Sequence, residues 1–189
     1  FLNAGVGYGG SCLPKDVRAL LHMAASAGCD LPLIAAVQQV NASQRMRVLQ
    51  KLHFFLGTIE GKTVTILGLA FKPNTDDIRE APALELIKLL LHNGGRVHAC
   101  DPVAVELAKS RIPTVRYFTD PYESDFVKLN WERVGAVMNR RLIIDGRNAL
   151  DGEQIRRLGF TYCGIGLGAR PAAPATKHYI DIDKGRFQP

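Results

Sequence analysis

The stretch TVTILGLAFKPNTDDIREAPALELIKLLLHNGGRVHAC, residues 63–100, decides the fold. Its β-branched start, 63–67, predicts a buried strand. A proline then begins a helix over 82–92 with its leucines on one side, and a glycine pair ends it before a second strand at 96–100. A strand, a helix and a strand in this order form a parallel pair with a right-handed crossover, so the sequence predicts an α/β fold.

The chain continues this pattern towards its C-terminus. Further elements are expected as a helix at 131–138, a strand at 142–144, a helix at 152–158 and a strand at 160–163. Residues 58–168 therefore predict a Rossmann-like domain with a parallel sheet. The Ala/Pro-rich residues 169–189 are expected to form a tail.

The chain before this domain has a different pattern. Residues 1–11, the glycine loop, hold four glycines, so their backbone can come close to a ligand. Apolar side chains then recur at helical spacing over 14–27 and 33–55, and the second of these helices also carries VNASQ, residues 40–44. Residues 1–57 thus predict a helical central segment ahead of the sheet domain.

Composition limits the class of protein. The 189 residues are 47% hydrophobic and 22% charged, with a net charge of +6. No apolar run reaches the roughly 18 residues of a membrane helix, and the basic residues neither cluster nor alternate with aromatic ones as in a nucleic-acid module. The cysteines and histidines lack zinc spacing, so no metal, membrane or nucleic-acid partner is expected.

The N-terminus lacks an initiator Met and any signal peptide. We therefore expect a fragment of a longer cytoplasmic protein with reduced cysteines. Of the four cysteines, Cys29, Cys100 and Cys163 are assigned to packing.

The remaining cysteine lies in GYGGSCLPKD, residues 7–16. A thiol just before a helix lies in the positive end of the helix dipole, which favours the thiolate nucleophile, and Lys15 strengthens this field. Asp16 follows Cys12 by four residues, so its carboxylate can orient a water molecule or accept a proton on the same face. The alternative is that Cys12 is an inert packing residue and Asp16 an ordinary first-turn acid.

Three segments resemble the UDP-glucose/GDP-mannose dehydrogenase family. FLNAGVGYGGSCLPKDVRAL is similar to the family's GxGxGGSCxPKD segment, GLAFKPNTDDIREAPALELI follows at 68–87, and IIDGRN at 143–148. The resemblance implies that NAD oxidises the hydroxymethyl group of a nucleotide sugar, here UDP-glucose, to a carboxylate in two steps. Cys12 would hold the thiohemiacetal and thioester, Asp16 would help the hydrolytic water, and Lys15 would lie near the cofactor.

The resemblance also implies the binding residues. The sugar nucleotide would be lined by Phe1, Leu2, Asn3, Tyr8 and Gly9. Lys72 and Arg147 would contact the substrate and Arg79 the pyrophosphate of NAD, while Asp76, Asp77 and Glu80 would hold their loop together. From the residues alone, Lys72 and Arg79 are equally compatible with solvated surface charges. The helix with VNASQ resembles the family's central helix, which implies a homo-oligomer, although an ordinary core helix fits the same pattern.

Two departures from the family pattern stand out. No NAD-binding domain precedes the cysteine loop, so this chain is not expected to be active alone. Near Glu123 and Ser124 the family has a further strand and the start of a helix, so either residues are missing here or a strand has been lost. GDP-mannose dehydrogenase and a non-catalytic nucleotide-sugar-binding or oligomerisation module remain alternatives. Ser11 stands where the branch acting on N-acetylated sugars usually has His.

Overall fold

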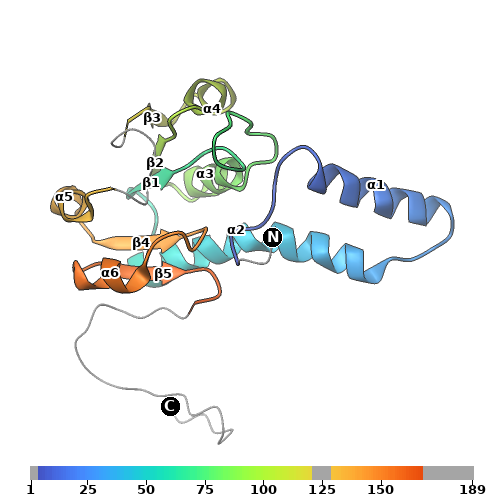
Figure 1. The fold of residues 1–189 in the computed structure, drawn as a ribbon, viewed down its shortest axis with the longest axis horizontal. Coiled ribbons are helices and arrows are strands. Elements are labelled where there is room, and N and C mark those ends of the chain that lie inside the picture. The colour runs from blue at the N-terminus through green and yellow to red at the C-terminus, as the bar shows by residue number, and fades with distance from the viewer. Residues whose placement is uncertain (1–3, 121–128, 168–189) are drawn as a thin grey trace, which may run out of the picture.

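The computed structural model describes residues 4–120 and 129–167 of the chain. Its shape combines a sheet-containing domain with a long pair of helices that projects from one side (Figure 1). The predicted α/β class is confirmed by these helices and parallel strands. Phe1, Leu2 and Asn3, the departure near Glu123, and the tail lie outside the described residues.

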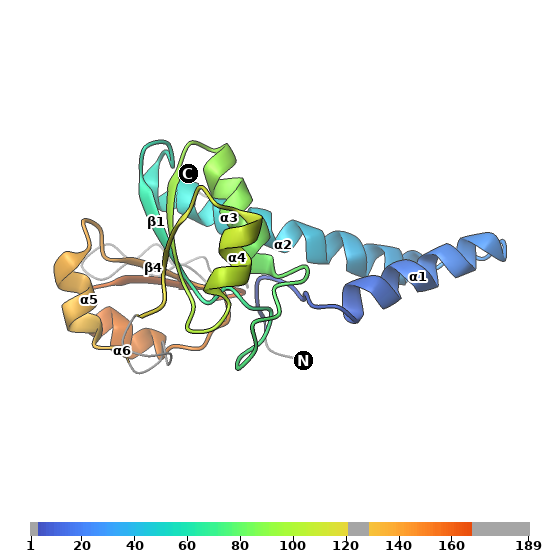
Figure 2. The ribbon, with the colours of Figure 1, turned by 90° about the horizontal axis from the view of Figure 1, so that it is seen from above.

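The projecting pair consists of α1 (Leu13–Ser26) and α2 (Pro32–Leu56). A proline lies in the first turn of each helix. Proline has no N–H, and at this position an N–H group would have no acceptor within the helix. Pro14 is the only buried residue of α1, whereas α2 buries residues only in its C-terminal half. We call residues 13–40 the helical hairpin; Figure 2 shows it extending away from the domain.

The first sheet has the parallel order β1-β2-β3, formed by β1 (Thr63–Leu67), β2 (Arg96–Cys100) and β3 (Arg116–Phe118). The predicted strands and the helix between them, α3 (Pro82–His92), are confirmed at the predicted residues. The strand β3 and the preceding α4 (Val105–Arg111) were not predicted. The helix α4 begins without a side-chain cap, whereas Asn130 and Asp151 cap the next two helices of the chain, and β3 has only three residues.

A second parallel sheet pairs β4 (Leu142–Asp145) with β5 (Thr161–Gly164). The helices α5 (Trp131–Val137) and α6 (Gly152–Arg157) precede these strands, as predicted to within a residue or two. Among the described strands, β1 is hydrogen-bonded only to β2, and β4 only to β5. The parallel strands thus form two sheets rather than one.

One large apolar core joins α2 and α3 to the first sheet. Ile87 and Leu90 of α3 are fully buried there, and Leu52 of α2 is 6% exposed. Leu142 and Ile144 of β4 pack against the same core, so it also joins the two sheets. Each such buried side chain contributes on the order of 2 kcal/mol relative to an exposed one.

The prediction that three cysteines serve packing is correct for two of them. Cys100 and Cys163 are buried, and burial raises the pKa of the Cys100 thiol to about 12. Cys29 is exposed, so its assignment was wrong. It lies in the short connection between α1 and α2, where no other element covers it.

Candidate active site

The glycine loop contacts both of the other segments that the sequence analysis singled out. The N–H of Gly10 donates to the carbonyl of Arg79 at 2.9 Å, in the loop between β1 and α3. The N–H of Val6 donates to the carbonyl of Gly146 at 3.0 Å, in the loop after β4. Asn148 adds a side-chain bond to the carbonyl of Ala4 at 3.3 Å. Three segments that are remote in sequence therefore meet at one place.

Glycine is required where these loops touch. A Cβ on Gly9 would lie 2.1 Å from the carbonyl oxygen of Glu80, closer than any real Cβ contact. Gly10 has a φ of +88°, and a Cβ there would lie 2.8 Å from the ring of Phe71. Glycine alone provides both the close approach and the left-handed backbone. The glycine pair before Ser11 thus has a packing role that is independent of any ligand.

Cys12 is the N-cap residue of α1, and its side chain is exposed. Its thiol lies 3.7 Å from the hydroxyl oxygen of Ser11. The backbone N–H groups of the first helical turn lack partners within the helix and carry the positive end of its dipole. The predicted location of the thiol at a helix N-terminus is therefore correct, and a reagent from solvent can reach it.

Lys15 and Asp16 lie in the first turn of the same helix. The Lys15 ammonium is 3.2 Å from the Asp16 carboxylate, and these side chains are 69% and 63% exposed. An exposed pair of this kind contributes little to stability, so both groups can turn towards a ligand at small cost. The backbone N–H of Asp16 donates to the carbonyl of Cys12 at 2.8 Å, which places the two residues one helical turn apart.

Arg79 is held by its own loop. Its guanidinium donates to the carboxylate of Asp77, with the shortest distance 2.6 Å from Nη2 to Oδ2. The hydrogen bonds from Arg79 lower the pKa of Asp77 to about 2. Glu80 accepts two bonds from Arg18 of α1, which lower the pKa of its carboxyl group. The expectation that Asp77 holds the loop together is confirmed, whereas Glu80 ties this loop to α1.

Arg147 is tied to the loop after β1. Its Nη2 donates to the carbonyl of Ala70 at 2.8 Å. The N–H of Ala70 in turn donates to Asp101, a buried carboxylate at the end of β2. Burial would raise the pKa of Asp101, but four backbone N–H bonds outweigh it and lower the pKa. Asp101 was not predicted as a site residue, although an Asp directly after a strand of a parallel sheet is a usable signal.

Asp145, at the end of β4, accepts hydrogen bonds from the following loop as Asp101 does after β2. Its carboxylate accepts the N–H of Arg147 at 3.0 Å, the N–H of Leu150 at 2.9 Å and the hydroxyl of Tyr162 at 2.9 Å. Burial, followed by the bond to Asp145, raises the pKa of the Tyr162 hydroxyl. The buried Asp145 therefore fixes the backbone from which the exposed Arg147 side chain reaches.

Comparisons with known proteins agree with this geometry. The description "UDP-glucose/GDP-mannose dehydrogenase family, central domain" matches residues 1–43, and "UDP-glucose/GDP-mannose dehydrogenase family, UDP binding domain" matches residues 65–125. The chain belongs to this family.

Relatives of this dehydrogenase-family chain include UDP-glucose 6-dehydrogenase TuaD of Bacillus subtilis, 40% identical over 195 residues, which cover 95% of this chain and 42% of the relative. The chain therefore spans less than half of that protein. Since 195 exceeds the 189 residues present here, the relative has residues inside the matched region that this chain lacks.

Solved structures of the family have the same fold. A UDP-glucose dehydrogenase from Pyrobaculum islandicum superposes with a TM-score of 0.67 at 33% identity, over 90% of this chain and 37% of that one. A GDP-mannose dehydrogenase from Pseudomonas aeruginosa gives 0.61 at 27% identity, over 87% and 37%. Both sugar classes named in the family are thus represented among its neighbours.

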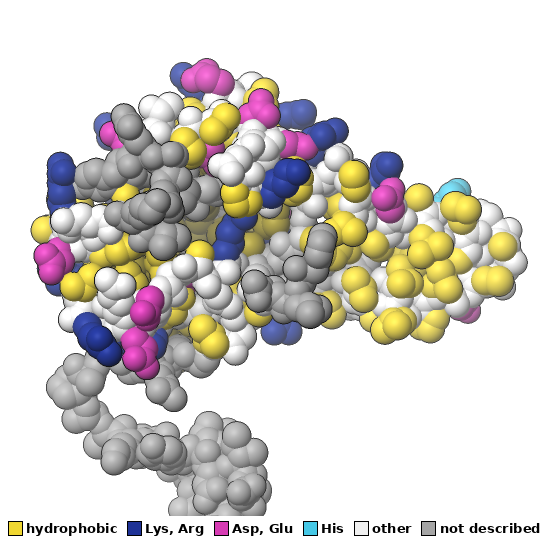
Figure 3. Space-filling model, in the orientation of Figure 1, with side chains coloured by type: hydrophobic (Ala, Val, Ile, Leu, Met, Phe, Trp, Pro, Cys, Tyr) yellow, Lys and Arg dark blue, Asp and Glu magenta, His cyan; other side chains and the backbone are white. Residues whose placement is uncertain are grey.

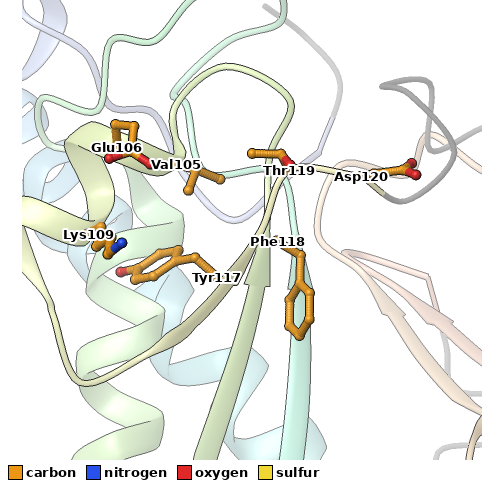
Figure 4. Close-up of a pocket in the computed structure, with 7 residues that line it drawn as sticks. All are labelled: Val105, Glu106, Lys109, Tyr117, Phe118, Thr119 and Asp120. Atoms are coloured by element: carbon orange, nitrogen blue, oxygen red, sulfur yellow. The ribbon is translucent and has the colours of Figure 1, made fainter.

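Two cavities of this chain lie beside α4. One, of about 440 Å³, is lined by Arg79 and Arg111 together with Thr75 and Asp77. The other, of about 390 Å³, lies on the side of Lys109 and Tyr117 (Figure 4). Neither cavity includes Cys12. The Cys12 thiol is exposed, and of these two cavities only the first borders a predicted site residue, Arg79.

The remaining site residues vary in exposure. Tyr8 and Gly9 are half-buried in the glycine loop, and Lys72 is exposed with its ammonium 5.3 Å from the centre of the Phe71 ring. No cluster of three or more potential metal ligands exists in residues 4–120 and 129–167. None of the helices described here is long and apolar enough to cross a membrane.

Proposed function

We propose that this chain carries the nucleophile and the nucleotide-sugar subsite for NAD-dependent oxidation of UDP-glucose to UDP-glucuronate. The observation that supports it best is the meeting of the glycine loop with the loops that carry Arg79 and Arg147. In this arrangement the loop that ends at the exposed Cys12 contacts the two loops that carry Lys72, Arg79 and Arg147. A module that only binds nucleotide sugars would not need the thiol.

In this proposal Cys12 captures the C6 aldehyde of the half-oxidised sugar. The sulfur forms a bond to the aldehyde carbon and the thiol proton passes to the carbonyl oxygen, which gives a thiohemiacetal. Transfer of a hydride to NAD and loss of the hydroxyl proton to solvent would leave a thioester, and water would then attack it to release the carboxylate, a proton and the thiol. Covalent capture divides a four-electron oxidation into smaller steps and retains the aldehyde. Asp16, one helical turn from Cys12, would position the water.

Lys72 and Arg147 would bind the UDP-glucose. Lys72 lies in the stretch that matches the family's UDP binding domain. A guanidinium recognises phosphate or sugar hydroxyls through paired hydrogen bonds. Within residues 4–120 and 129–167, the guanidinium of Arg147 uses only its Nη2, which donates to Ala70. Half-buried Tyr8 and Gly9 lie beside this region, and we assign Phe1, Leu2 and Asn3 to the same subsite.

Lys15 and Arg79 fit one part of NAD, its pyrophosphate, because both are exposed cations near Cys12. NAD, when bound, would supply the hydride acceptor. Arg79 is paired with Asp77, so binding would require the guanidinium to share or exchange this partner.

We also propose that the chain forms a homo-oligomer through the helical hairpin. Figure 3 shows apolar side chains gathered over its surface. Leu33 is 75% exposed and Met23 66% exposed, which is costly in water for side chains of this size. The four free cysteines agree with a reducing, cytoplasmic location.

Protection of Cys12 from alkylation tests the proposed substrate. The chain is treated with iodoacetamide alone, with UDP-glucose or with GDP-mannose, and alkylation of each cysteine is followed by peptide mass spectrometry. UDP-glucose is expected to slow alkylation of Cys12 and to leave exposed Cys29 unchanged, because Cys29 lies at the far end of the hairpin. Arg147→Met and Lys72→Met should weaken this protection.

The other outcomes decide between the alternatives. Protection by GDP-mannose but not UDP-glucose would assign the chain to the GDP-mannose branch. Binding of UDP-glucose by calorimetry without any protection of Cys12 would overturn the catalytic assignment and favour a binding module. Equal effects on Cys12 and Cys29 would show a general action of the nucleotide and would also contradict the proposed subsite.

A further inference from the structure

Arg45 is a buried cation in α2 and is only 4% exposed. Residues Val48, Leu49 and Leu52, which follow on the same helical side, belong to the apolar core. A guanidinium at such a position costs free energy unless polar or charged partners compensate it. Its presence therefore requires an explanation beyond packing.

The partners of Arg45 come from three segments. Its Nε lies 2.9 Å from Oε2 of Glu85 in α3, an ion pair without hydrogen-bond geometry. Its Nη2 donates to the carbonyl of Tyr8 at 3.3 Å, and its Nη1 donates to the carbonyl of Asn41. Arg45 therefore connects two helices to the glycine loop.

Asn41, one helical turn before Arg45, holds the same loop residue. The N–H of Tyr8 donates to Oδ1 of Asn41 at 2.7 Å, and Nδ2 of Asn41 donates to the carbonyl of Tyr8 at 3.1 Å. One amide side chain thus binds both backbone groups of Tyr8, which fixes the peptide units on either side. We call these bonds of Asn41 and Arg45 to Tyr8 the Tyr8 clamp.

The glycine loop packs closely against the Tyr8 clamp at Gly7. A Cβ on Gly7 would lie 2.5 Å from Oδ1 of Asn41 and 2.8 Å from Nη1 of Arg45. Gly7 also has a φ of +101°, a conformation that other residues rarely adopt. The backbone therefore passes directly over the two side chains, which agrees with a dedicated fit between helix and loop.

We propose that Asn41 and Arg45 are positioning residues for Cys12. They act through the backbone of Tyr8, four residues before the thiol. Between Tyr8 and Ser11 lie only Gly9 and Gly10, which have many conformations when they are not held. With the Tyr8 clamp in place the loop is fixed at Tyr8 and again at Gly10, so the thiol has one orientation at the start of α1. Its importance for catalysis rests on the proposed nucleophilic role of Cys12.

The test uses this chain without nucleotide. Asn41→Ala and Arg45→Met are compared with wild type, and Arg47→Met is the matched control because Arg47 is an exposed arginine on the same helix. Hydrogen exchange of the peptide covering residues 5–12 is expected to rise about tenfold in both variants and to stay unchanged in the control. The rate of Cys12 alkylation should change severalfold relative to that of Cys29.

Conservative variants separate positioning from general stability. Arg45→Lys keeps the charge and should restore part of the protection from exchange. Asn41→Asp keeps the acceptor for the Tyr8 N–H but loses the donor to its carbonyl, so it should lie between wild type and Asn41→Ala. Alkylation of buried Cys100 reports global unfolding. If Arg45→Met unfolds and exposes Cys100 to alkylation, the exchange and alkylation rates of the conservative variants Asn41→Asp and Arg45→Lys test the proposal instead.

The proposal is overturned if folded Asn41→Ala and Arg45→Met leave both exchange at 5–12 and the Cys12 rate unchanged, or if Arg47→Met has the same effect as Arg45→Met. Because these readouts need no substrate, they are independent of the proposed reaction. If UDP-glucose does not slow the alkylation of Cys12 in wild type, this result counts against the proposed function and not against the Tyr8 clamp.

Discussion

The helical hairpin and the sheet domain differ in how far their apolar side chains are buried. In the domain, helices cover the first sheet, and side chains such as Ile87, Leu90 and Leu69 are fully buried. In the hairpin, Leu33 and Met23 are among the most exposed apolar side chains of the described residues. A single helix, α2, belongs to both regions, with its exposed half in the hairpin and its buried half in the core.

This difference teaches that the two regions complete their cores at different levels of organisation. The domain buries its apolar surface within one chain, which is the usual arrangement. The hairpin has only α1 and α2 to pack on each other, and α1 buries nothing but Pro14. We infer that its apolar surface is completed by association.

The largest expected effect comes from the buried half of α2. Leu52→Ala should lower the free energy of unfolding by about 3 kcal/mol, because it leaves a cavity in the core. Urea unfolding measures the change. Leu33→Ala, on the exposed half, is the control and should change the value by less than about 0.5 kcal/mol in dilute solution. Equal losses in the two variants would contradict the division of α2.

Asp101 gives the next largest effect, with a defined pH dependence. Asp101→Asn should lower the free energy of unfolding by about 2 kcal/mol at neutral pH, because the variant loses charged acceptors for four backbone N–H groups. The pKa of Asp101 is lowered in the folded state. Its stabilisation is therefore full above the unfolded value of about 4 and is lost as the pH falls through the lower folded value.

Urea unfolding of wild type and Asp101→Asn at neutral pH and near pH 3 measures this dependence. The difference between the two proteins should shrink as the pH falls. Asp151→Asn is the comparison, because Asp151 is an exposed cap of α6 whose pKa is also lowered. An Asn side chain still accepts the N–H groups of this cap, so the change in the free energy of unfolding should be smaller than for Asp101→Asn. A difference for Asp101→Asn that grows towards acid pH would show that its carboxylate is not stabilising.

A substitution in the helical hairpin should change self-association more than the free energy of unfolding. Val40→Asp introduces a charge where Val40 is 53% exposed. The free energy of unfolding of the isolated chain should change by less than about 0.5 kcal/mol. Sedimentation velocity over a range of concentrations should show weaker self-association than wild type. An unchanged oligomer would place the contact elsewhere.

The smallest change in stability is expected at the junction of the two regions. Lys15→Ala removes an exposed ion pair with Asp16 and should cost less than about 0.5 kcal/mol. Alkylation of Cys12 should nevertheless slow a few-fold, because the ammonium adds to the positive potential at the start of α1. Arg47→Ala, which removes an exposed cation of α2, is the control and should leave the rate of Cys12 alkylation unchanged.

The sequence predicted the elements with strong local signals. The strands and helix between 63 and 100 were predicted at the observed residues, since β-branched runs, a proline and a glycine pair mark their limits. Local patterns do not show which strands share a sheet, so the split into two sheets was not foreseen. The elements α4 and β3 were missed, because α4 has no capping side chain to mark its start and β3 has only three residues.

The candidate site was predicted unevenly. Motifs indicated Cys12 and the loop of Arg79, and the structure brings these segments together. Motifs did not indicate that Arg79 is bonded to Asp77 or that Arg45 is buried, since both depend on tertiary contacts. One signal for Arg45 was present in the sequence: it lies three, four and seven residues before core positions of the same helix, where an apolar side chain is usual.

The bonds that build the site also determine when it can form. Tyr8 and Asn41 are 33 residues apart, Ala70 and Arg147 are 77 apart, and Ala4 and Asn148 are 144 apart. Closing loops of this length costs entropy that only a largely folded chain recovers, and such contacts slow folding. The helices of the hairpin can form early from local contacts. The segment around the thiol is synthesised before the rest of the described chain, yet it reaches its final conformation only after the strand that precedes Arg147 has joined its sheet.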